Sequence, residues 1–492
     1  MQKKFLSNLI LVLFLNLLVK PVYIFFIDRG VQNAVGTVDY GFYFNLLNYV
    51  LILNIILDLG ITNYNNRNIA QNSQLLSKHF SGIIVLRLFL GLAYVITTLF
   101  ISIFYYHLDI LQIKVLLLLG VNQFLVSFTL YLRSNISGLL LFRTDSLISV
   151  LDRLLLIIIC GFLLLNESTR LNFNILWFVY AQTFAYACTT LTALVVVLRK
   201  VKGFKIKFNY PFYLMIIKQS FPLALLVFLM GFYLRSDALF LKRMLDNGDY
   251  YVGVYAAAFR IFEAGNNISF LMAGLLLPLF SKMLKNKDSV ERIVKLSFTM
   301  VIVSSMLVAV ISTFYDMEIM SLLYGKGVSE SSVAYQIRIK EIAQAFSIIM
   351  IGFIPVSGSY IFGTLLTANG SFKILNWIAF ASVIVSFSLN ILLIPHMQAT
   401  GACIANVSAC MLSLILQLIV TRKLFHFSFG MKYLLKIASY IFIIFVLGYY
   451  SKYISSQWLV NLIVLVFLSI GLALTLRLIK VKAFFQILKE KD

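Results

Sequence analysis

Residues 148–166 read ISVLDRLLLIIICGFLLLN, and this stretch indicates the class of fold. From Leu154 to Leu165 it contains no charged side chain. A helix of about 20 such residues crosses the roughly 30 Å of hydrocarbon in a bilayer. Runs of this kind recur along the whole chain. The medium that surrounds most of the protein is therefore lipid.

The overall composition points the same way. Of 492 residues, 61% are hydrophobic and only 12% are charged, and the mean hydropathy is +0.94. A soluble domain carries about 25% charged residues. The net charge of +22 could indicate a nucleic-acid partner. However, the basic residues form short groups between the apolar runs, as membrane topology requires, so we expect no nucleic-acid binding.

The apolar runs predict an all-α integral membrane protein with about fourteen transmembrane helices. The first run continues past Lys20 to Ile27, which favours a retained helix over a cleaved signal peptide. Unbroken apolar runs also argue against barrel strands, whose residues alternate. The predicted spans are 5–27, 40–60, 80–106, 112–132, 148–166, 174–198, 217–241, 252–281, 294–315, 342–366, 374–395, 400–421, 433–450 and 457–478.

Lysine and arginine concentrate at both termini and in alternate loops, with most acids in the remaining loops. Because positive charge stays on the inner side, we predict that both termini are cytoplasmic. The predicted location is the cell inner (cytoplasmic) membrane, with multiple passes.

An internal repeat divides the chain. Residues 39–43 (DYGFY) resemble residues 251–255 (YVGVY), with their glycines 212 positions apart. Each copy begins a helix after a short outer loop. This pattern predicts two six-helix lobes related by a parallel pseudo-two-fold axis. The predicted parts are an N-terminal lobe at 1–198, a basic cytoplasmic linker at 199–216, a C-terminal lobe at 217–421, and two extra helices with a basic tail at 422–492.

Several polar side chains fall within the predicted spans. A charge at membrane depth costs at least about 2.5–3.5 kcal/mol, so it faces protein or a water-filled cavity and marks a candidate site. Basic residues outnumber acids in this set, which favours an anionic substrate, because guanidinium groups bind phosphate oxygens in pairs. The candidate substrate-binding residues are Lys20, Arg87, Arg235, Asp237, Arg260, Glu263, Asn45 and Asn48.

Structural roles are the alternatives for these residues. Arg87 could extend toward the cytoplasmic face. Arg235 and Asp237 could form an ion pair at the outer interface. Arg260 and Glu263 are three residues apart and can pair on one helix face.

Lys20 precedes a proline that can kink its helix. Asp58, Asp152 and Arg153 are assigned to cytoplasmic helix ends, where charges are ordinary. The first predicted helix has no carboxylate until Asp28 at its outer end, whereas a proton- or cation-coupled exporter would place one deep in the bundle.

Neither enzymatic nor metal chemistry is indicated. No outer loop exceeds about 30 residues, and no phosphate-binding loop for ATP occurs. We therefore expect no catalytic residue and no cofactor. The four cysteines lie within apolar runs without the spacing of a metal or disulfide framework, and the four histidines (His79, His107, His396 and His426) form no cluster.

The chain resembles the polysaccharide-repeat-unit (Wzx-type, O-antigen) flippases of the multidrug/oligosaccharidyl-lipid/polysaccharide (MOP) exporter superfamily. The resemblance rests on short motifs whose order and spacing match over nearly the whole chain. It departs after Pro395, where the family usually has a glycine and His396, Met397 and Gln398 stand here. The motifs are at 58–61 (DLGI), 67–70 (RNIA), 235–237 (RSD), 253–257 (GVYAA), Arg260, Pro278, 323–325 (LYG), 366–373, Asn390, 394–395 and 401–405 (GACIA).

The resemblance implies transport of an undecaprenyl-pyrophosphate-linked oligosaccharide by alternating access, with basic residues holding the pyrophosphate. Membrane lipid and the polysaccharide polymerase and glycosyltransferase machinery would be its partners. The rival functions are a cation-coupled drug exporter of the same superfamily, a membrane-embedded glycan polymerase or ligase, and a lipid II flippase. The last would be distinguished by being essential for growth.

Overall fold

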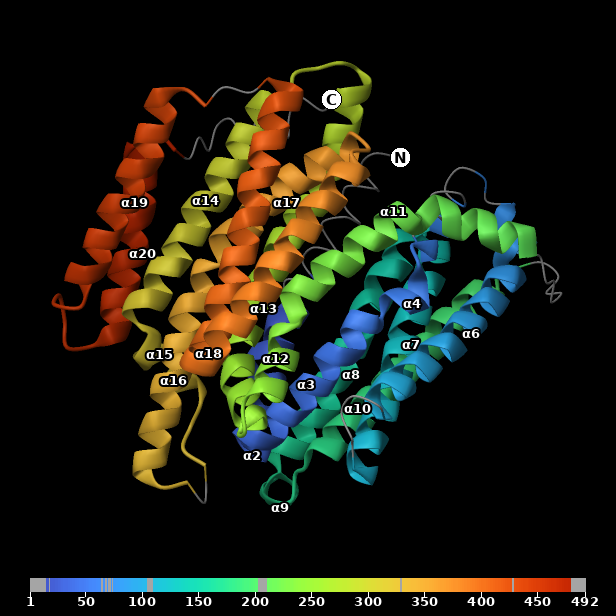
Figure 1. Cartoon of the computed structure of the whole chain (residues 1–492), viewed down its shortest axis with the longest axis horizontal. Coiled ribbons are helices and arrows are strands. Elements are labelled where there is room, and N and C mark those ends of the chain that lie inside the picture. The colour runs from blue at the N-terminus through green and yellow to red at the C-terminus, as the bar shows by residue number, and fades with distance from the viewer. Residues whose placement is uncertain are drawn as a thin grey trace. The chain divides into compact units, whose positions relative to one another are not determined.

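The computed structural model describes residues 15, 16, 18–62, 65, 66, 69, 72, 74–103, 109–201, 210–327, 330–426 and 429–478. All regular structure in these ranges is helical (Figure 1). Twelve helices in the described part are long and apolar enough to cross a membrane. The predicted all-α membrane class is therefore confirmed.

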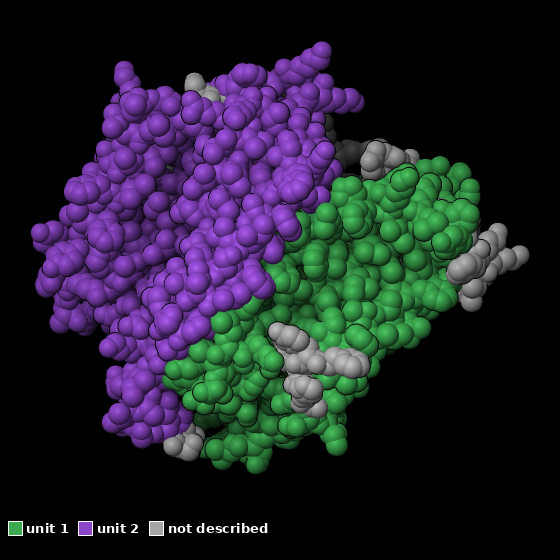
Figure 2. Space-filling view, viewed as in Figure 1, with its two compact units in different colours: residues 1–256 green, residues 257–492 purple. Residues whose placement is uncertain are grey.

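The chain divides into two compact units, residues 1–256 and 257–492 (Figure 2). The helices of the first unit are η1 (Tyr23–Asp28), α2 (Arg29–Val35), α3 (Thr37–Leu53), α4 (Ile55–Asp58), α6 (Leu75–Ile101), α7 (Ile110–Gly138), α8 (Phe142–Leu165), α9 (Glu167–Leu171), α10 (Ile175–Leu198), α11 (Tyr210–Arg235), α12 (Asp237–Met244) and the start of α13 (Gly248–Lys285). The second unit holds the rest of α13, then α14 (Glu291–Phe314), α15 (Asp316–Leu323), α16 (Ser332–Ile351), α17 (Phe353–Ala368), α18 (Phe372–Phe425), α19 (Met431–Ser451) and α20 (Trp458–Thr475). The lobe boundaries drawn from the repeat stay a prediction.

Most predicted spans coincide with helices. The run at 174–198 is α10, and the run at 433–450 is α19. The 54 residues of α18 include Gln398, whose φ of 47° and ψ of −127° interrupt the helix. Its two parts correspond to the predicted spans 374–395 and 400–421. These backbone angles favour glycine, so a glutamine here carries strain.

The first span ends later than predicted. Residues 5–14 and 17 lie outside the described residues, and residues 18–22 are helical. The π-helical turn η1 starts two residues after Pro21, and α2 continues to Val35, ending at Gly36 with φ +86°. The predicted end at Ile27 was wrong because the polar residues Asp28 and Gln32 are themselves buried inside the helical segment.

The seventh span is interrupted. It was predicted to run unbroken from 217 to 241, but α11 ends at Arg235 and α12 starts at Asp237. Both helices pack against α3 in the first unit. The break places the charges of residues 235 and 237 at a junction between two helices.

The two repeat glycines meet at a close crossing of α3 and the start of α13. A Cβ atom on Gly41 would lie 1.9 Å from the carbonyl oxygen of Asp249, and one on Gly253 would lie 2.0 Å from that of Thr37. The side-chain amide of Gln32 also donates to the Gly253 carbonyl at 3.1 Å. The repeat therefore marks a reciprocal backbone contact that only glycine permits.

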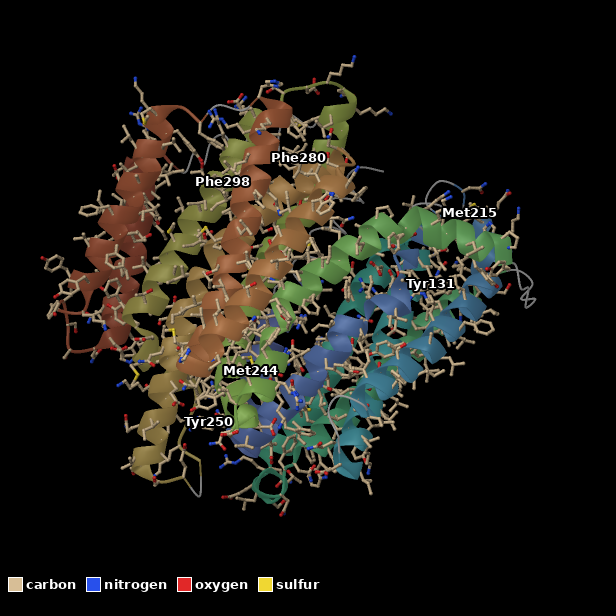
Figure 3. All side chains as sticks on the ribbon, viewed as in Figure 1. Tyr131, Met215, Met244, Tyr250, Phe280 and Phe298 are labelled. Carbon is tan, nitrogen blue, oxygen red and sulfur yellow. The ribbon has the colours of Figure 1, made fainter. Side chains whose placement is uncertain are left out.

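Each unit has an apolar interior and a lipid-compatible surface. Phe80, Tyr131 and their neighbours fill the core of the first unit, and Phe280 and Phe298 belong to a core in the second (Figure 3). Large apolar side chains remain outside, including Phe442 and Phe467, each 71% exposed. Such exposure is expected of side chains that contact lipid tails.

Replacing Gly253 with alanine should therefore destabilise the protein, because the added methyl group overlaps a backbone atom that cannot rotate away. We expect a loss of about 3 kcal/mol or more. On the same helix, a methyl group added at Gly274 would have no other atom within 4 Å. Gly274→Ala should be neutral or stabilising by up to about 1 kcal/mol. Thermal unfolding of the two purified variants checks this, and equal melting temperatures would contradict the crossing.

Candidate functional site

A buried carboxylate lies within the first helical segment. Asp28 ends the π-helical turn and is only 2% exposed. The hydroxyl of Tyr40 on α3 donates to its Oδ2 at 2.7 Å. Asp28 is therefore about two turns inside the helical segment, whereas the sequence analysis had placed it at the outer end. π-Helical turns are rare and occur frequently at functional sites.

A similar arrangement holds Asp237 at the start of α12. This carboxylate is fully buried, and the hydroxyl of Tyr255 on α13 donates to its Oδ2 at 2.8 Å. In both cases a tyrosine from the helix that carries a repeat glycine contacts the acid. A charge-assisted hydrogen bond of this kind partly offsets the cost of burial.

Arg235 and Asn48 lie together although they are 187 positions apart in sequence. The Arg235 guanidinium donates to Asn48 Oδ1 at 3.2 Å, and the Asn48 amide donates to the carbonyl of Phe44 at 2.8 Å. Arg235 remains partly exposed, while Asn48 is buried. Asn45, one turn away, is 2% exposed and its Oδ1 has no hydrogen-bond partner in the described part of the chain. The sequence analysis selected all three residues separately.

Arg260 and Glu263 form the predicted pair on α13. Their side chains are 15% and 21% exposed, and Nη1 lies 2.8 Å from Oε2. The Asn267 amide donates to the carbonyl of Glu263 at 2.9 Å. The pair lies in the second unit, and its guanidinium remains partly accessible.

Arg87 occupies different surroundings from those expected. Its side chain is 1% exposed. It forms an ion pair with Asp58 and donates to the hydroxyls of Ser127 at 2.8 Å and Thr62 at 2.6 Å. Its guanidinium also lies 5.1 Å from the Tyr131 ring centroid. Asp58 ends α4 and is 30% exposed, and it is also a partner in this network.

The sequence analysis missed Arg153. The predicted span began at 148, which put Arg153 near a helix end, but α8 begins at Phe142 and Arg153 lies near its middle. The guanidinium is 4.6 Å from the Tyr23 ring centroid and donates to the Tyr186 hydroxyl at 3.4 Å. The side chain is 30% exposed. Arg133 and Asp145 were the sequence signal for an earlier start of α8. Their ion pair at 2.7 Å joins the end of α7 to the first turn of α8, before residue 148.

The motif at 323–325 has a structural explanation. The Tyr324 hydroxyl donates to the carbonyl of Ala257 at 3.1 Å, and Arg338 donates to that of Gly325 at 2.8 Å. Arg338 also pairs with Glu330 at 2.8 Å, and this hydrogen bond lowers the pKa of the Glu330 carboxyl. These contacts secure the loop before α16.

No metal chemistry emerges in the described ranges. No group of three or more His, Cys, Asp or Glu side chains there could hold a metal ion. His107 and the motif residues Arg67, Asn68 and Ala70 lie outside the described residues. All four cysteines are free thiols, and three of them are buried.

The exposure of the charges in the first unit is uneven. Asp28 and Asp237 are buried against tyrosine hydroxyls. Lys20 (on the turn before η1), Arg153 and Arg235 are all partly exposed. Arg153 also lies 3.6 Å from the Asp152 carboxylate. These three cations are therefore more accessible than the two buried acids.

Comparisons with known proteins identify a family by sequence and related structures by fold. The sequence model of a family described as "Polysaccharide biosynthesis protein" matches residues 5–284. A comparison with curated protein sequences finds no match. Among solved structures, the chain is similar to the lipid II flippase MurJ in an inward closed conformation, with a TM-score of 0.74 and 13% identity over 97% of this chain and 99% of that one.

Two further structures share the fold. One is an inward-facing multidrug resistance MATE family transporter of the MOP superfamily, with a TM-score of 0.61 and 14% identity over 86% of this chain and 100% of that one. The other is a MOP superfamily transporter from Pyrococcus furiosus, described by the reverse polarity of its binding pocket, with a TM-score of 0.57 and 14% identity over 85% and 94% of the two chains.

Arg87 should prove structural. Arg87→Met removes the cation that pairs with Asp58 and leaves only the Gly60 and Thr62 donors on this carboxylate. Breaking a largely buried pair in this way costs about 3–5 kcal/mol. The double variant Arg87→Met/Asp58→Leu removes both charges and should recover most of the lost stability. Melting temperatures of the purified variants measure this. A single variant as stable as the parent protein would contradict the buried network.

Proposed function

Because the chain belongs to the polysaccharide biosynthesis protein family of the MOP superfamily, we propose that it is a flippase for a lipid-linked oligosaccharide. The proposed cargo is an undecaprenyl-pyrophosphate-linked repeat unit, moved across the cytoplasmic membrane by alternating access. The protein would catalyse no bond formation. The polymerase and glycosyltransferases of the same pathway would supply and consume its cargo.

One observation carries the proposal: among the charged candidate residues of the first unit, Lys20, Arg153 and Arg235 are partly exposed, whereas the acids Asp28 and Asp237 are buried. A pyrophosphate is the most strongly charged part of the proposed cargo. Guanidinium groups bind its oxygens in pairs, and an ammonium group contributes a compact point charge. The same residues would attract a cationic drug poorly.

The proposal assigns a role to each residue within its own unit. Lys20, Arg153 and Arg235 of the first unit contact the pyrophosphate, and Arg260 is the corresponding anion-binding candidate of the second unit. Asn48 holds the Arg235 guanidinium in place through its Oδ1, and Glu263 does the same for Arg260.

Three more residues complete the assignment. Asn45 offers its unsatisfied Oδ1 to a sugar hydroxyl, since a buried carbonyl oxygen without a donor is costly. Asp237 fixes the start of α12 through Tyr255 and does not contact cargo. Arg87, buried beside Asp58, supports the fold of the first unit.

Single substitutions test the site. Lys20→Ala, Arg153→Ala, Arg235→Ala and Arg260→Ala should each lower surface polysaccharide about tenfold or more, because each removes a charge-assisted contact. Lys373→Ala serves as the control, since this exposed lysine begins α18 away from the site residues on α13. Polysaccharide is measured in cells that contain equal amounts of each variant. Full export by both the Lys20 and Arg260 variants would show that the assigned site is wrong.

A specific observation also favours a second candidate, a proton-coupled exporter. Asp28 is the buried carboxylate in the first lobe that such an exporter requires, and the sequence analysis had placed it too far outward.

Asp28→Asn separates the two functions. If the protein is a flippase that binds its cargo through the cationic residues, this variant should keep most of its export. The amide oxygen introduced at position 28 still accepts a hydrogen bond from Tyr40. Asp237→Asn, which alters the matching tyrosine-bound acid, is the control. Loss of transport in the Asp28→Asn variant but not in the Asp237→Asn variant would favour the exporter, as would residual transport that no longer depends on pH.

A further inference from the structure

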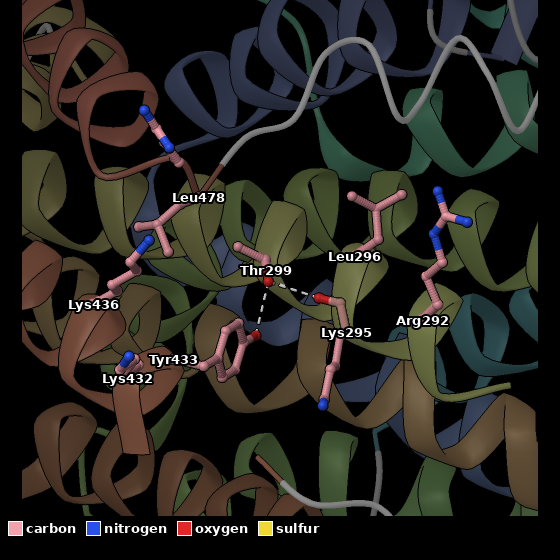
Figure 4. Close-up of a pocket in the computed structure, with 9 residues that line it drawn as sticks. Arg292, Lys295, Leu296, Thr299, Lys432, Tyr433, Lys436 and Leu478 are labelled. Carbon is pink, nitrogen blue, oxygen red and sulfur yellow. Dashed lines mark hydrogen bonds between the residues drawn. The ribbon is translucent and has the colours of Figure 1, made fainter. Parts of the chain in front are cut away.

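A basic pocket lies in the second unit, at one end of α14, α19 and α20. Its volume is about 430 Å³. The size is in the range of pockets that hold small ligands. Figure 4 shows the lining residues, which come from the first turns of α14 and α19 and from the segment just after α20. They are Arg292, Lys295, Leu296, Thr299, Lys432, Tyr433, Lys436, Arg477 and Leu478.

The positive charge in this pocket is largely uncompensated. Lys295 forms an ion pair with Glu291. The other four cations, Arg292, Lys432, Lys436 and Arg477, form no ion pair within the described part of the chain. All four are exposed. An anion that enters the pocket would therefore meet cations that have no competing carboxylate.

Helix direction adds to this field. The pocket lies at the N-termini of α14 and α19, where the helix dipoles are positive and basic side chains are unfavourable. Placing Arg292, Lys295, Lys432 and Lys436 there costs stability unless an anion is bound. Orientation signals require basic residues on this side of the membrane, but they do not require cations from three helices to converge on one cavity.

The walls of the pocket are ordered. Thr299 Oγ1 and the Tyr433 hydroxyl share a hydrogen bond of 2.8 Å, and the Tyr433 ring stacks on Phe429 at 5.6 Å. Arg477 has φ +53° and follows the last turn of α20, where Leu478 donates to the carbonyl of Ala473 at 2.9 Å. This helix-ending motif normally places glycine in the left-handed position. Here Arg477 occupies the left-handed position, and the buried Leu478 that follows it fixes this end of the helix.

Apolar surface continues from the pocket along the helices. On α19, Leu434 and Leu435 are 47% and 58% exposed between the two lysines of the pocket, and Leu474 on α20 is 47% exposed. A ligand with a negative head and apolar tails would satisfy both surfaces. A free anion would use only the first.

We propose that this pocket binds the phosphodiester headgroup of an anionic phospholipid in the cytoplasmic leaflet. The predicted orientation puts this end of the three helices on the cytoplasmic side, where basic pockets between helices bind such headgroups. The pocket shares no lining residue with the cargo residues Lys20, Arg153, Arg235 and Arg260. Bound lipid would hold α19 and α20 against α14, so the proposal concerns the anchoring of the last two helices and does not depend on the transported cargo.

Binding of dioleoyl phosphatidylglycerol to the purified full chain in neutral detergent, followed by native mass spectrometry, tests the proposal. Dioleoyl phosphatidylcholine and inorganic phosphate are the other two ligands. We expect the anionic lipid to bind and to raise the melting temperature, and neither of the other two to do so at the same concentration. Equal effects of inorganic phosphate would show a site for a free anion and overturn the proposal. Equal binding of the two lipids would overturn it as well.

Variants locate the site. Lys432→Gln/Lys436→Gln should weaken phosphatidylglycerol binding about tenfold or more. The control Lys282→Gln/Lys285→Gln removes the same charge from the exposed end of α13, on the same side of the membrane and outside the pocket. Equal losses in the two double variants would mean that only net charge matters and would overturn the pocket.

If the Lys432→Gln/Lys436→Gln variant folds poorly, Arg477→Gly provides an independent test of the pocket. Glycine suits the left-handed backbone of this position, so the variant should be as stable as the parent protein or more so. It should nevertheless bind phosphatidylglycerol several-fold more weakly. Unchanged binding by a stable Arg477→Gly protein would contradict the assignment.

Discussion

The high cost of placing a charge in hydrocarbon governs this molecule. Each deeply buried charge among the described residues has a partner that explains it. Arg87 has Asp58 and two hydroxyls, Asp28 has Tyr40, and Asp237 has Tyr255. These contacts connect α6 to α4 and α7, η1 to α3, and α12 to α13, so they link most helices of the first unit to a satisfied charge. The cations Lys20, Arg153 and Arg235 are partly exposed.

The repeat glycines extend this arrangement. Gly41 and Gly253 let the backbones of α3 and α13 touch, and the neighbouring Tyr40 and Tyr255 each donate to a buried acid on another helical element. A methyl group at either glycine would separate α3 from α13. The sequence similarity between residues 39–43 and 251–255 thus has a direct physical cause in helix packing.

Apolar length and period were enough to predict the helices, because lipid imposes a strict requirement on both. They could not predict where a helix with polar residues ends. The first helical segment continues to Val35 because Asp28 and Gln32 find partners in other helices. Arg153 was assigned to a helix end because α8 starts six residues before the predicted span. The partner of Arg87 could not be predicted either, since Asp58 comes from another helix. Nothing local in a sequence states which distant side chain will satisfy a buried charge.

The central claim is that the accessible cations recognise the pyrophosphate of a lipid-linked glycan. The most direct measurement compares two cargoes in proteoliposomes that contain the purified protein. One is a polyprenyl-pyrophosphate-linked saccharide with a fluorescent label, and the other is the same labelled saccharide joined to the polyprenol without phosphate. Rapid transbilayer movement of the first cargo alone is the predicted result. Equal rates for both cargoes, or movement of neither while a cationic drug is exported, would contradict the claim.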